Sequence, residues 1–211
     1  MSDLKLNQDA IEYEAKFYPV DKEEYRKKLL SVGAKLLRAE RKMIRVIADS
    51  KVNAIIPNMN YLRVRDEGHL IRLSYNTTAG NDGKLSDQKE IDVDVSDFSK
   101  TVKIIEALGI KFNRRQETLR EEWSYKGAEI TIDTWPGLDT YSEIEAHSEE
   151  EVKEIAEELG FDWNKKVITA AAEIYERVYK IDIEKVLEMI TNISFENNSF
   201  EGLEKHELEY N

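Results

Sequence analysis

Two glutamate pairs with the pattern E-x-E lie in segments that alternate between apolar and polar residues. Glu12 and Glu14 form the first pair, and Glu143 and Glu145 form the second. In an extended strand, residues two apart point to the same face, so each pair would place two carboxylates on one side. Carboxylates that face one another repel unless cations neutralise them. Because Mg²⁺ and Mn²⁺ favour oxygen ligands, the two pairs predict a divalent metal site.

Arginines occupy the segments between the two acidic pairs. Arg63 and Arg65 alternate with apolar residues, and Arg72 and Arg120 follow in later segments. The forked donors of a guanidinium group match the oxygens of a phosphate. Acidic residues at both ends with arginines between them therefore predict a site that holds a phosphate chain together with metal ions.

The ionic residues also form one face in each segment that alternates between apolar and polar residues. An open sheet with one solvated face would explain any single segment of this kind. The alternative is a barrel whose apolar faces pack outward against helices and whose ionic faces line the interior, and the grouping of signs favours it. The ionic positions are Glu12, Glu14, Lys16, Arg63, Arg65, Arg72, Glu90, Asp92, Asp94, Arg120, Glu122, Glu129, Asp133, Glu143 and Glu145.

Strands and helices can be placed from the same alternation and from turn residues. Helices are predicted after the capping residues Asp21 and Ser148 and at about Phe98 to Leu108, each ending before a glycine. From Asn164 onward an apolar stripe at helical spacing predicts further helices. The predicted strands are 11–17, 35–48, 61–65, 70–76, 88–95, 117–125, 128–133 and 141–147.

The composition narrows the class of protein. A chain of 211 residues with 41 % hydrophobic residues can bury a sizeable core, and its 35 % charged residues leave room for an ionic interior. No apolar run approaches the roughly 20 residues of a membrane span. A net charge of -12 argues against a nucleic-acid surface. The absence of cysteine and of an apolar leader favours a cytoplasmic protein.

These motifs resemble the CYTH superfamily, the triphosphate tunnel metalloenzymes, over roughly residues 10 to 160. The E-x-E-x-K hallmark is Glu12-Tyr13-Glu14-Ala15-Lys16, and four further motifs follow in the family order: "YLRVRDEG", "KEIDVDV", "REEW" and "IDTWPGLDTYSEIE". The resemblance implies an α+β fold, an eight-stranded antiparallel β-barrel tunnel with helices packed outside. The tunnel domain would comprise residues 1–162. The helical pattern beyond it predicts an appendage packed on the barrel at 163–196, and the polar, acidic composition of 197–211 predicts a flexible tail.

The resemblance also implies a role for each ionic residue. Glu12, Glu14, Lys16 and Asp133 would be catalytic. Mg²⁺ or Mn²⁺ would bind Glu12, Glu14, Asp133, Glu143 and Glu145. A triphosphate such as ATP would bind Lys16, Arg63, Arg65, Arg72 and Arg120. Glu90 and Asp92 of the same binding site would either join the acidic cluster or orient these cations.

Two positions depart from the family pattern. Asn76 stands where relatives commonly carry a lysine, and Thr118 and Leu119 stand where a second lysine is usual. The loss of two cations would weaken binding of a triphosphate or change which one is preferred. Lys84 and Lys89 are candidates to replace the lost charge.

Three functions remain open from the sequence. The first is metal-dependent hydrolysis of a triphosphate, which would be a nucleotide, inorganic triphosphate or thiamine triphosphate. The second is a class IV adenylyl cyclase that makes cyclic AMP from ATP. The third is a nucleotide-binding protein without turnover. A homodimer formed through the apolar stripe after Asn164 is a further open alternative.

Overall fold

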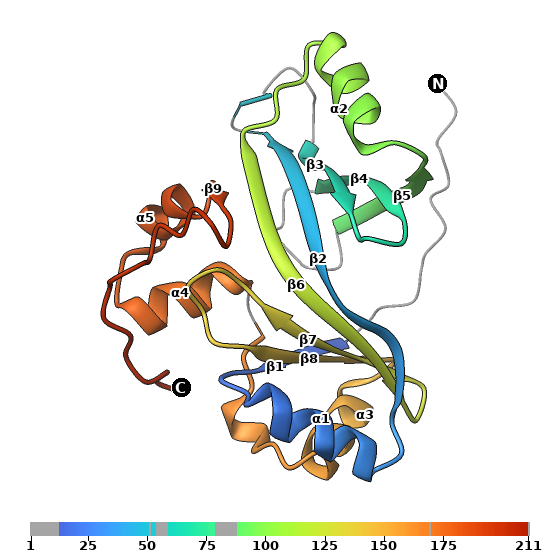
Figure 1. Cartoon of the computed structure of the whole chain (residues 1–211), viewed down its shortest axis with the longest axis vertical. Helices are drawn as coiled ribbons and strands as arrows, with labels where there is room; N and C mark the ends of the chain where they lie inside the picture. Colours follow the sequence, from blue (N-terminus) through green and yellow to red (C-terminus); the bar gives the residue numbers. More distant parts are fainter. Residues whose placement is uncertain (1–12, 51, 54–58, 79–87, 169, 211) are drawn as a thin grey trace. The chain divides into compact units, whose positions relative to one another are not determined.

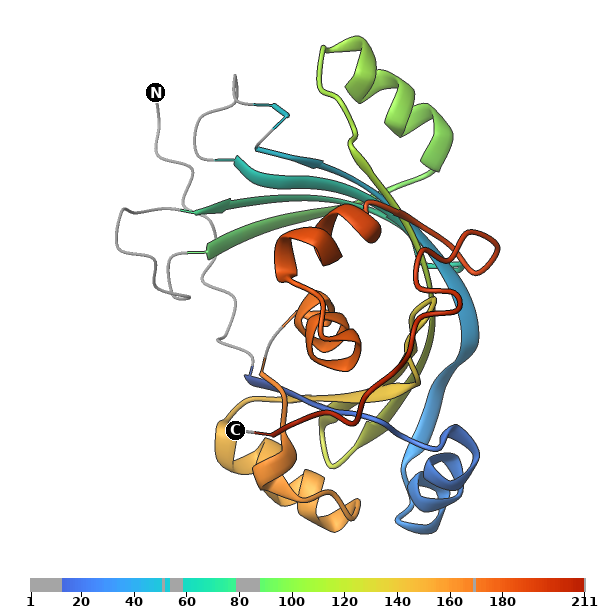
Figure 2. The same cartoon turned by 90° about the vertical axis from the view of Figure 1, so that its left-hand side faces the viewer.

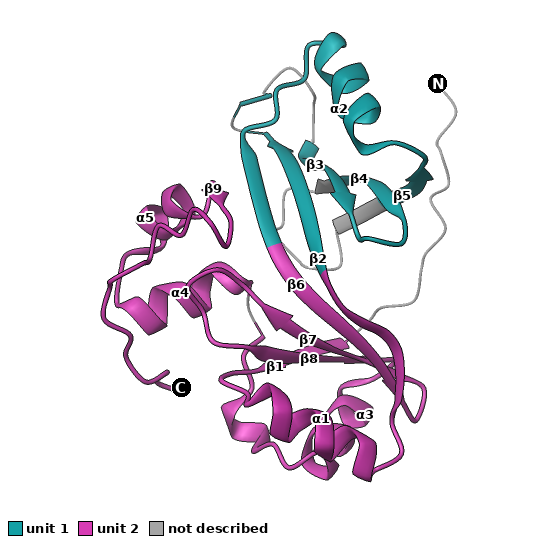
Figure 3. Cartoon of the chain, viewed as in Figure 1, with its two compact units in different colours: residues 1–9, 42–117 teal, residues 10–41, 118–211 magenta. Residues whose placement is uncertain are grey.

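A computed structural model describes residues 13–50, 52–53, 59–78, 88–168 and 170–210, and only the backbone at 77–78 and 88–90. The chain forms two compact units, coloured separately in Figure 3. Unit 1 comprises residues 1–9 and 42–117, and unit 2 comprises residues 10–41 and 118–211. The long strands β2 (Lys35–Asp49) and β6 (Arg114–Tyr125) each contribute to both units.

The strands pair in the order β1–β8–β7–β6–β2–β3–β4–β5, and β9 pairs with β6 (Figure 1). Their bounds are β1 Tyr13–Phe17, β3 Met59–Asp66, β4 Ile71–Thr78, β5 Gln88–Val95, β7 Ala128–Thr134, β8 Tyr141–Ala146 and β9 Asn192–Ile193. The ladders within each unit are antiparallel, which confirms the predicted antiparallel α+β class. In the described residues this order ends at β1 and β5, so the closed barrel stays a prediction.

Helices α1 (Lys22–Ser31) and α3 (Glu149–Glu158) cover the apolar face of the sheet in unit 2. Both begin at the predicted capping residues, because Asp21 accepts a hydrogen bond from the Glu24 amide at 2.9 Å and Ser148 accepts one from the Glu151 amide at 3.2 Å. Their apolar residues join alternate residues of β1, β7 and β8 in one core. The core residues from these strands are Ala15, Phe17, Ala128, Ile130, Ile132, Ile144 and Ala146.

Helices α4 (Ala171–Tyr179) and α5 (Ile183–Met189) follow a short 3-10 helix (Trp163–Lys165) and form a second core with the opposite face of the same sheet. Tyr18 and Tyr141, which lie in this core, are out of phase with the residues packed on α1 and α3. Figure 1 shows α4 and α1 on opposite sides of β7 and β8. The appendage therefore packs on the face of the sheet opposite to α1 and α3.

The apolar stripe of the appendage is buried inside unit 2. Ile174, Val178 and Val186 are each 0 % exposed, so the stripe is not available for the predicted dimer contact. The segment predicted as a flexible tail adds Phe200 and Leu208 to the same core. These two apolar residues lie among charged ones, and only their contacts with α4 and the β7–β8 turn distinguish a packed segment from a solvated tail.

Helix α2 (Phe98–Ala107) covers the apolar face of the sheet in unit 1. Its cap is Asp97, which accepts a hydrogen bond from the Lys100 amide at 2.8 Å. Phe98, Val102 and Ile105 pack against residues that alternate along β2, β3 and β4. The helices α1, α2 and α3 thus lie on apolar faces, as predicted, and leave the ionic face of each unit on the other side.

Candidate functional site

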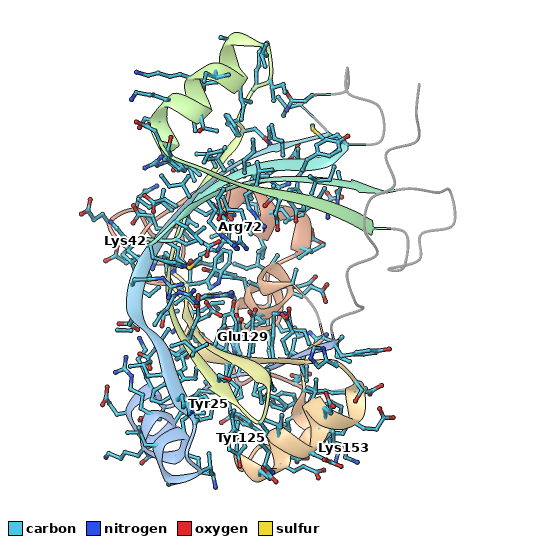
Figure 4. All side chains as sticks on the ribbon, turned by 90° about the vertical axis from the view of Figure 1, so that its right-hand side faces the viewer. Tyr25, Lys42, Arg72, Tyr125, Glu129 and Lys153 are labelled. Carbon is cyan, nitrogen blue, oxygen red and sulfur yellow. The ribbon has the colours of Figure 1, made fainter. Side chains whose placement is uncertain are left out.

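The ionic residues of unit 2 form rows across β1, β8, β7 and β6. Lys16 lies opposite Glu143, and Glu143 lies opposite Thr131. In the next row, Glu145 lies between Glu14 on β1 and Glu129 on β7. Directly opposed residues in an antiparallel ladder share a face, so the predicted residues of these strands come together. Figure 4 shows Glu129 on the side of the sheet away from Tyr25 of α1.

Arg120 links two of the predicted carboxylates. Its Nε donates to Asp133 Oδ1 at 2.8 Å, and its Nη2 donates to Asp133 Oδ2 at 2.8 Å and to Glu143 Oε2 at 2.7 Å. Thr131 Oγ1 donates to Asp133 Oδ2 at 2.7 Å. Asp133 is 1 % exposed, so its charge is buried and is compensated by the bidentate guanidinium.

Lys16 is the second cation of this cluster and is 8 % exposed. Its Nζ donates to Glu14 and lies 3.5 Å from Glu143 Oε1. Lys16 on the neighbouring strand β1 and Arg120 on β6, two strands away, thus both contact Glu143 of β8. A ligand that carries negative charge can exchange with these carboxylates for the same cations.

The cluster shifts the pKa values of its two carboxyl groups, Asp133 and Glu143, in opposite directions. Burial would raise the pKa of Glu143, but the charges of Arg120 and Lys16 outweigh burial and hold this pKa below its usual value. Burial keeps the pKa of Asp133 above its usual value despite Arg120, and the charge of Glu143 adds to the shift. Glu143 is therefore the carboxylate that stays ionised most readily, as a metal ligand must.

A second cluster on this face joins the predicted ionic residue Glu122 to two arginines that the alternation pattern missed. Glu122, two residues from Arg120, is 5 % exposed and accepts hydrogen bonds from Arg38 and Arg41. Arg41 Nη1 also lies 3.5 Å from the Arg120 carbonyl oxygen. Because Arg38 and Arg41 are three apart on β2, a period of two cannot place both on one face. That both arginines pair with Glu122 is therefore visible only in the contacts of the folded chain.

The Glu122 cluster makes stability depend on pH. Burial would raise the pKa of Glu122, but Arg41 and Arg38 outweigh it and lower this pKa. The stability that the ionised group contributes is therefore complete above its unfolded pKa of about 4.3 and is lost as the pH falls through its folded pKa. We expect Glu122→Gln to lower the melting temperature at pH 7 and to differ less from the unsubstituted protein at pH 3.

Thermal unfolding followed by circular dichroism at both pH values measures this effect. Glu158→Gln, which removes an exposed partner of Lys126, is the control and should change little at either pH. An equal deficit of Glu122→Gln at pH 7 and pH 3 would show that packing, not charge, is the source of the loss.

Unit 1 carries an arginine-rich face on β3 and β4. Arg65 lies opposite Arg72, and Glu67 approaches both, with Arg65 Nε donating to Glu67 Oε1 at 2.8 Å and Arg72 Nε at 4.0 Å from it. Arg63 Nη2 donates to Ser74 Oγ at 3.2 Å. The turn residue Glu67, 5 % exposed, is a further site candidate that sequence reasoning missed, because it follows the strand instead of alternating within it.

The remaining predicted residues of unit 1 lie on β4 and β5. Asp92 is exposed and lies opposite Ser74. Asn76 is 4 % exposed and accepts a hydrogen bond from Asn60 at 2.9 Å. The backbone of Glu90 lies opposite Asn76. The structure does not describe the side chains of Glu90 and Lys89. Glu12 and Lys84 also lie outside the described residues, and Thr118 is 2 % exposed on β6.

The ionic face of unit 2 offers the type of ligand atom that a divalent cation prefers. Glu14, Glu143 and Glu145 supply carboxylate oxygens, which hard cations prefer. Within the described residues, however, no three acidic or histidine side chains are gathered as a metal site. Glu14, Glu143 and Asp133 are instead paired with the ammonium group of Lys16 and the guanidinium group of Arg120.

A scan against family models matches residues 10–179 to the CYTH domain. The chain belongs to the CYTH family. This family includes triphosphatases and class IV adenylyl cyclases. No curated protein sequence matches the chain. Among the described residues, no helix has the length and apolar character needed to cross a bilayer.

Solved structures of CYTH-like fold resemble the chain over most of its length. A "putative adenylate cyclase" from Vibrio parahaemolyticus has a TM-score of 0.63 at 12 % identity, covering 80 % of this chain and 99 % of that one. A conserved hypothetical protein from Pyrococcus furiosus has a TM-score of 0.60 at 19 % identity, covering 77 % and 99 %. The PH1819 protein from Pyrococcus horikoshii has 0.54 at 23 %, covering 78 % and 97 %. At these identities the likeness concerns the fold.

Proposed function

We propose that this CYTH protein is a metal-dependent enzyme that binds and hydrolyses a triphosphate. The observation that carries the proposal is the unit 2 cluster, where the buried Lys16 and the partly buried Arg120 share a face with paired carboxylates. Burying charged groups costs desolvation free energy, so a cluster of them on one face favours a functional role. A phosphate chain is the ligand class that fits both kinds of group at once, with metal ions between it and the acids.

Lys16 and Arg120 are the groups that bind phosphate oxygens in this proposal. Their donors contact Glu14, Glu143 and Asp133 without ligand, and phosphate oxygens would replace part of these contacts. Asp133, held by Arg120 and Thr131, would orient the guanidinium toward the substrate. The arginine face of unit 1, with Arg63, Arg65 and Arg72, remains a predicted phosphate-binding surface.

Glu14, Glu143 and Glu145, together with Glu12, would hold Mg²⁺ or Mn²⁺, with Asp133 as an additional predicted ligand. A bound divalent ion would supply charge neutralisation for the phosphate oxygens during attack on phosphorus. The low pKa of Glu143 keeps this carboxylate ionised at neutral pH. Release of Glu143 from Lys16 and Arg120 on substrate binding would free its oxygens for the cation.

A class IV adenylyl cyclase is the second candidate. The family includes such cyclases, and one relative in fold is named as a "putative adenylate cyclase". Both reactions use the same cations and carboxylates. They differ in whether water attacks the terminal phosphorus or the ribose 3′-hydroxyl attacks the α-phosphorus.

The product identifies the reaction. We expect the purified protein, incubated with inorganic triphosphate, thiamine triphosphate or ATP and with Mg²⁺ or Mn²⁺, to release inorganic phosphate. Chromatography of the products separates phosphate from cyclic AMP with pyrophosphate. Formation of cyclic AMP would show that the protein is an adenylyl cyclase and not a hydrolase. Binding by calorimetry without any product would favour a binding protein, and neither binding nor product would refute the proposed function.

A further inference from the structure

The end of β1 is held by residues from the C-terminus of the chain. We call residues 198–210 the C-terminal segment; it lies beyond residue 179, where the family match ends. Tyr210 Oη donates a hydrogen bond to the carbonyl oxygen of Tyr18, which directly follows β1. Figure 2 shows this segment passing beside β1 in unit 2.

The Tyr18 side chain is tied to the same segment through Asp139 of the β7–β8 turn. Tyr18 Oη donates to Asp139 Oδ2 at 3.0 Å, and Lys205 Nζ donates to Asp139 Oδ1 at 2.8 Å. The Tyr18 carbonyl thus contacts the C-terminal segment directly, and the Tyr18 ring contacts it through Asp139.

The segment is itself firmly packed. Phe200 and Leu208 are 2 % and 7 % exposed, and the His206 amide donates to the Val178 carbonyl of α4 at 2.7 Å. Gly137, with a φ of +86°, lets the β7–β8 turn approach the segment, because a Cβ there would lie 2.9 Å from Asn198 Oδ1. A side chain bonded to this segment therefore has a fixed anchor.

Lys16 lies two residues before Tyr18 on the same face of β1. The Lys16 amide donates to the Val167 carbonyl at 2.9 Å, and the Val167 amide donates to the Lys16 carbonyl at 2.8 Å. β1 is the first strand of the sheet order, so its outer edge lacks a full partner strand in the described part of the chain. Val167 at Lys16 and Tyr210 at Tyr18 hold this edge instead.

We propose that Tyr210 is a positioning residue that places the Lys16 ammonium for phosphate binding through the end of β1. The inference rests on the proposed function, since it assigns Lys16 a phosphate ligand. Without the hydroxyl of Tyr210, the Tyr18 carbonyl loses its tether and β1 gains freedom at the point where Lys16 must meet Glu143 and the ligand.

The test combines a point variant with a double-mutant cycle in the full-length chain. Tyr210→Phe removes one hydroxyl and keeps the ring. Binding of inorganic triphosphate with Mg²⁺ is measured by calorimetry at low ionic strength for the unsubstituted protein, Tyr210→Phe, Lys16→Met and the double variant. We expect Tyr210→Phe to weaken binding about fivefold. In the Lys16→Met background the same change should have no effect.

Hydrogen exchange of the β1 amides provides a readout without ligand. Tyr210→Phe should speed exchange at Lys16, whereas Tyr125→Phe should not, although it too removes a hydroxyl, one that donates to Glu158 at 3.0 Å. Equal weakening by Tyr210→Phe in both Lys16 backgrounds, or unchanged exchange, would overturn the positioning role. If the unsubstituted protein does not bind triphosphate, the proposed function fails along with this role, and the exchange data alone show whether Tyr210 tethers β1.

Discussion

Arg120→Met should abolish measurable triphosphate binding and destabilise the fold. The guanidinium of Arg120 makes three charged hydrogen bonds to Asp133 and Glu143. Its loss leaves the 1 % exposed Asp133 carboxylate, within the described part of unit 2, with Thr131 as its remaining side-chain donor. Removal of one partner of a buried ion pair lowers the free energy of unfolding by about 3 kcal/mol. Affinity should fall at least about 100-fold, as expected for the loss of two charged contacts. Denaturant unfolding and calorimetry measure the two effects.

Arg26→Met is the matched control for this substitution. Arg26 Nη2 contacts the 3 % exposed Glu121 at 2.5 Å, on the opposite face of the same strand β6. This variant should also lose stability, because among the described side chains Glu121 keeps only the Trp123 donor, at 2.6 Å. It should retain triphosphate binding. If both variants lost affinity in proportion to stability, the cation of Arg120 would have no specific role in binding.

Replacement of both acids of the first pair, Glu12→Gln with Glu14→Gln, should reduce turnover at least about 100-fold. The variant should keep its melting temperature, because the Glu14 side chain is 38 % exposed and Lys16 retains Glu143 at 3.5 Å. Amides no longer offer the charged oxygens that a divalent ion requires. Phosphate release with Mg²⁺ and with Mn²⁺, together with thermal unfolding, measures the result.

The control for the double substitution is Glu150→Gln with Glu154→Gln on α3. These two acids are exposed on the helix that covers the apolar face, so their removal changes the net charge equally without touching the ionic face. Turnover of this control should be unchanged. Full activity of the Glu12 and Glu14 variant would remove the metal-site hypothesis for the first pair.

Much of the fold was accessible from local pattern. The alternation of Ala15 and Phe17 with Glu14 and Lys16 predicted both the strand and its two faces, and the cores on α1 and α3 confirm the division. Asp21 and Ser148 predicted the helix starts because capping is a contact over three residues. The shared face of Lys16, Glu143 and Glu145 was predictable for the same reason, since a period of two needs no tertiary information.

By itself, the sequence determined the class of this protein: antiparallel strands with one ionic face, helices on the other, and paired acids and arginines that resemble the CYTH family. Only the tertiary structure decided which charges meet. Glu122 with Arg38 and Arg41, and Tyr210 with Tyr18, are joined across long stretches of sequence. The C-terminal segment looked like a solvated tail by composition, yet Phe200 and Leu208 are buried. Strand register and nonlocal packing are set by the summed contacts of the folded chain, which no local period encodes.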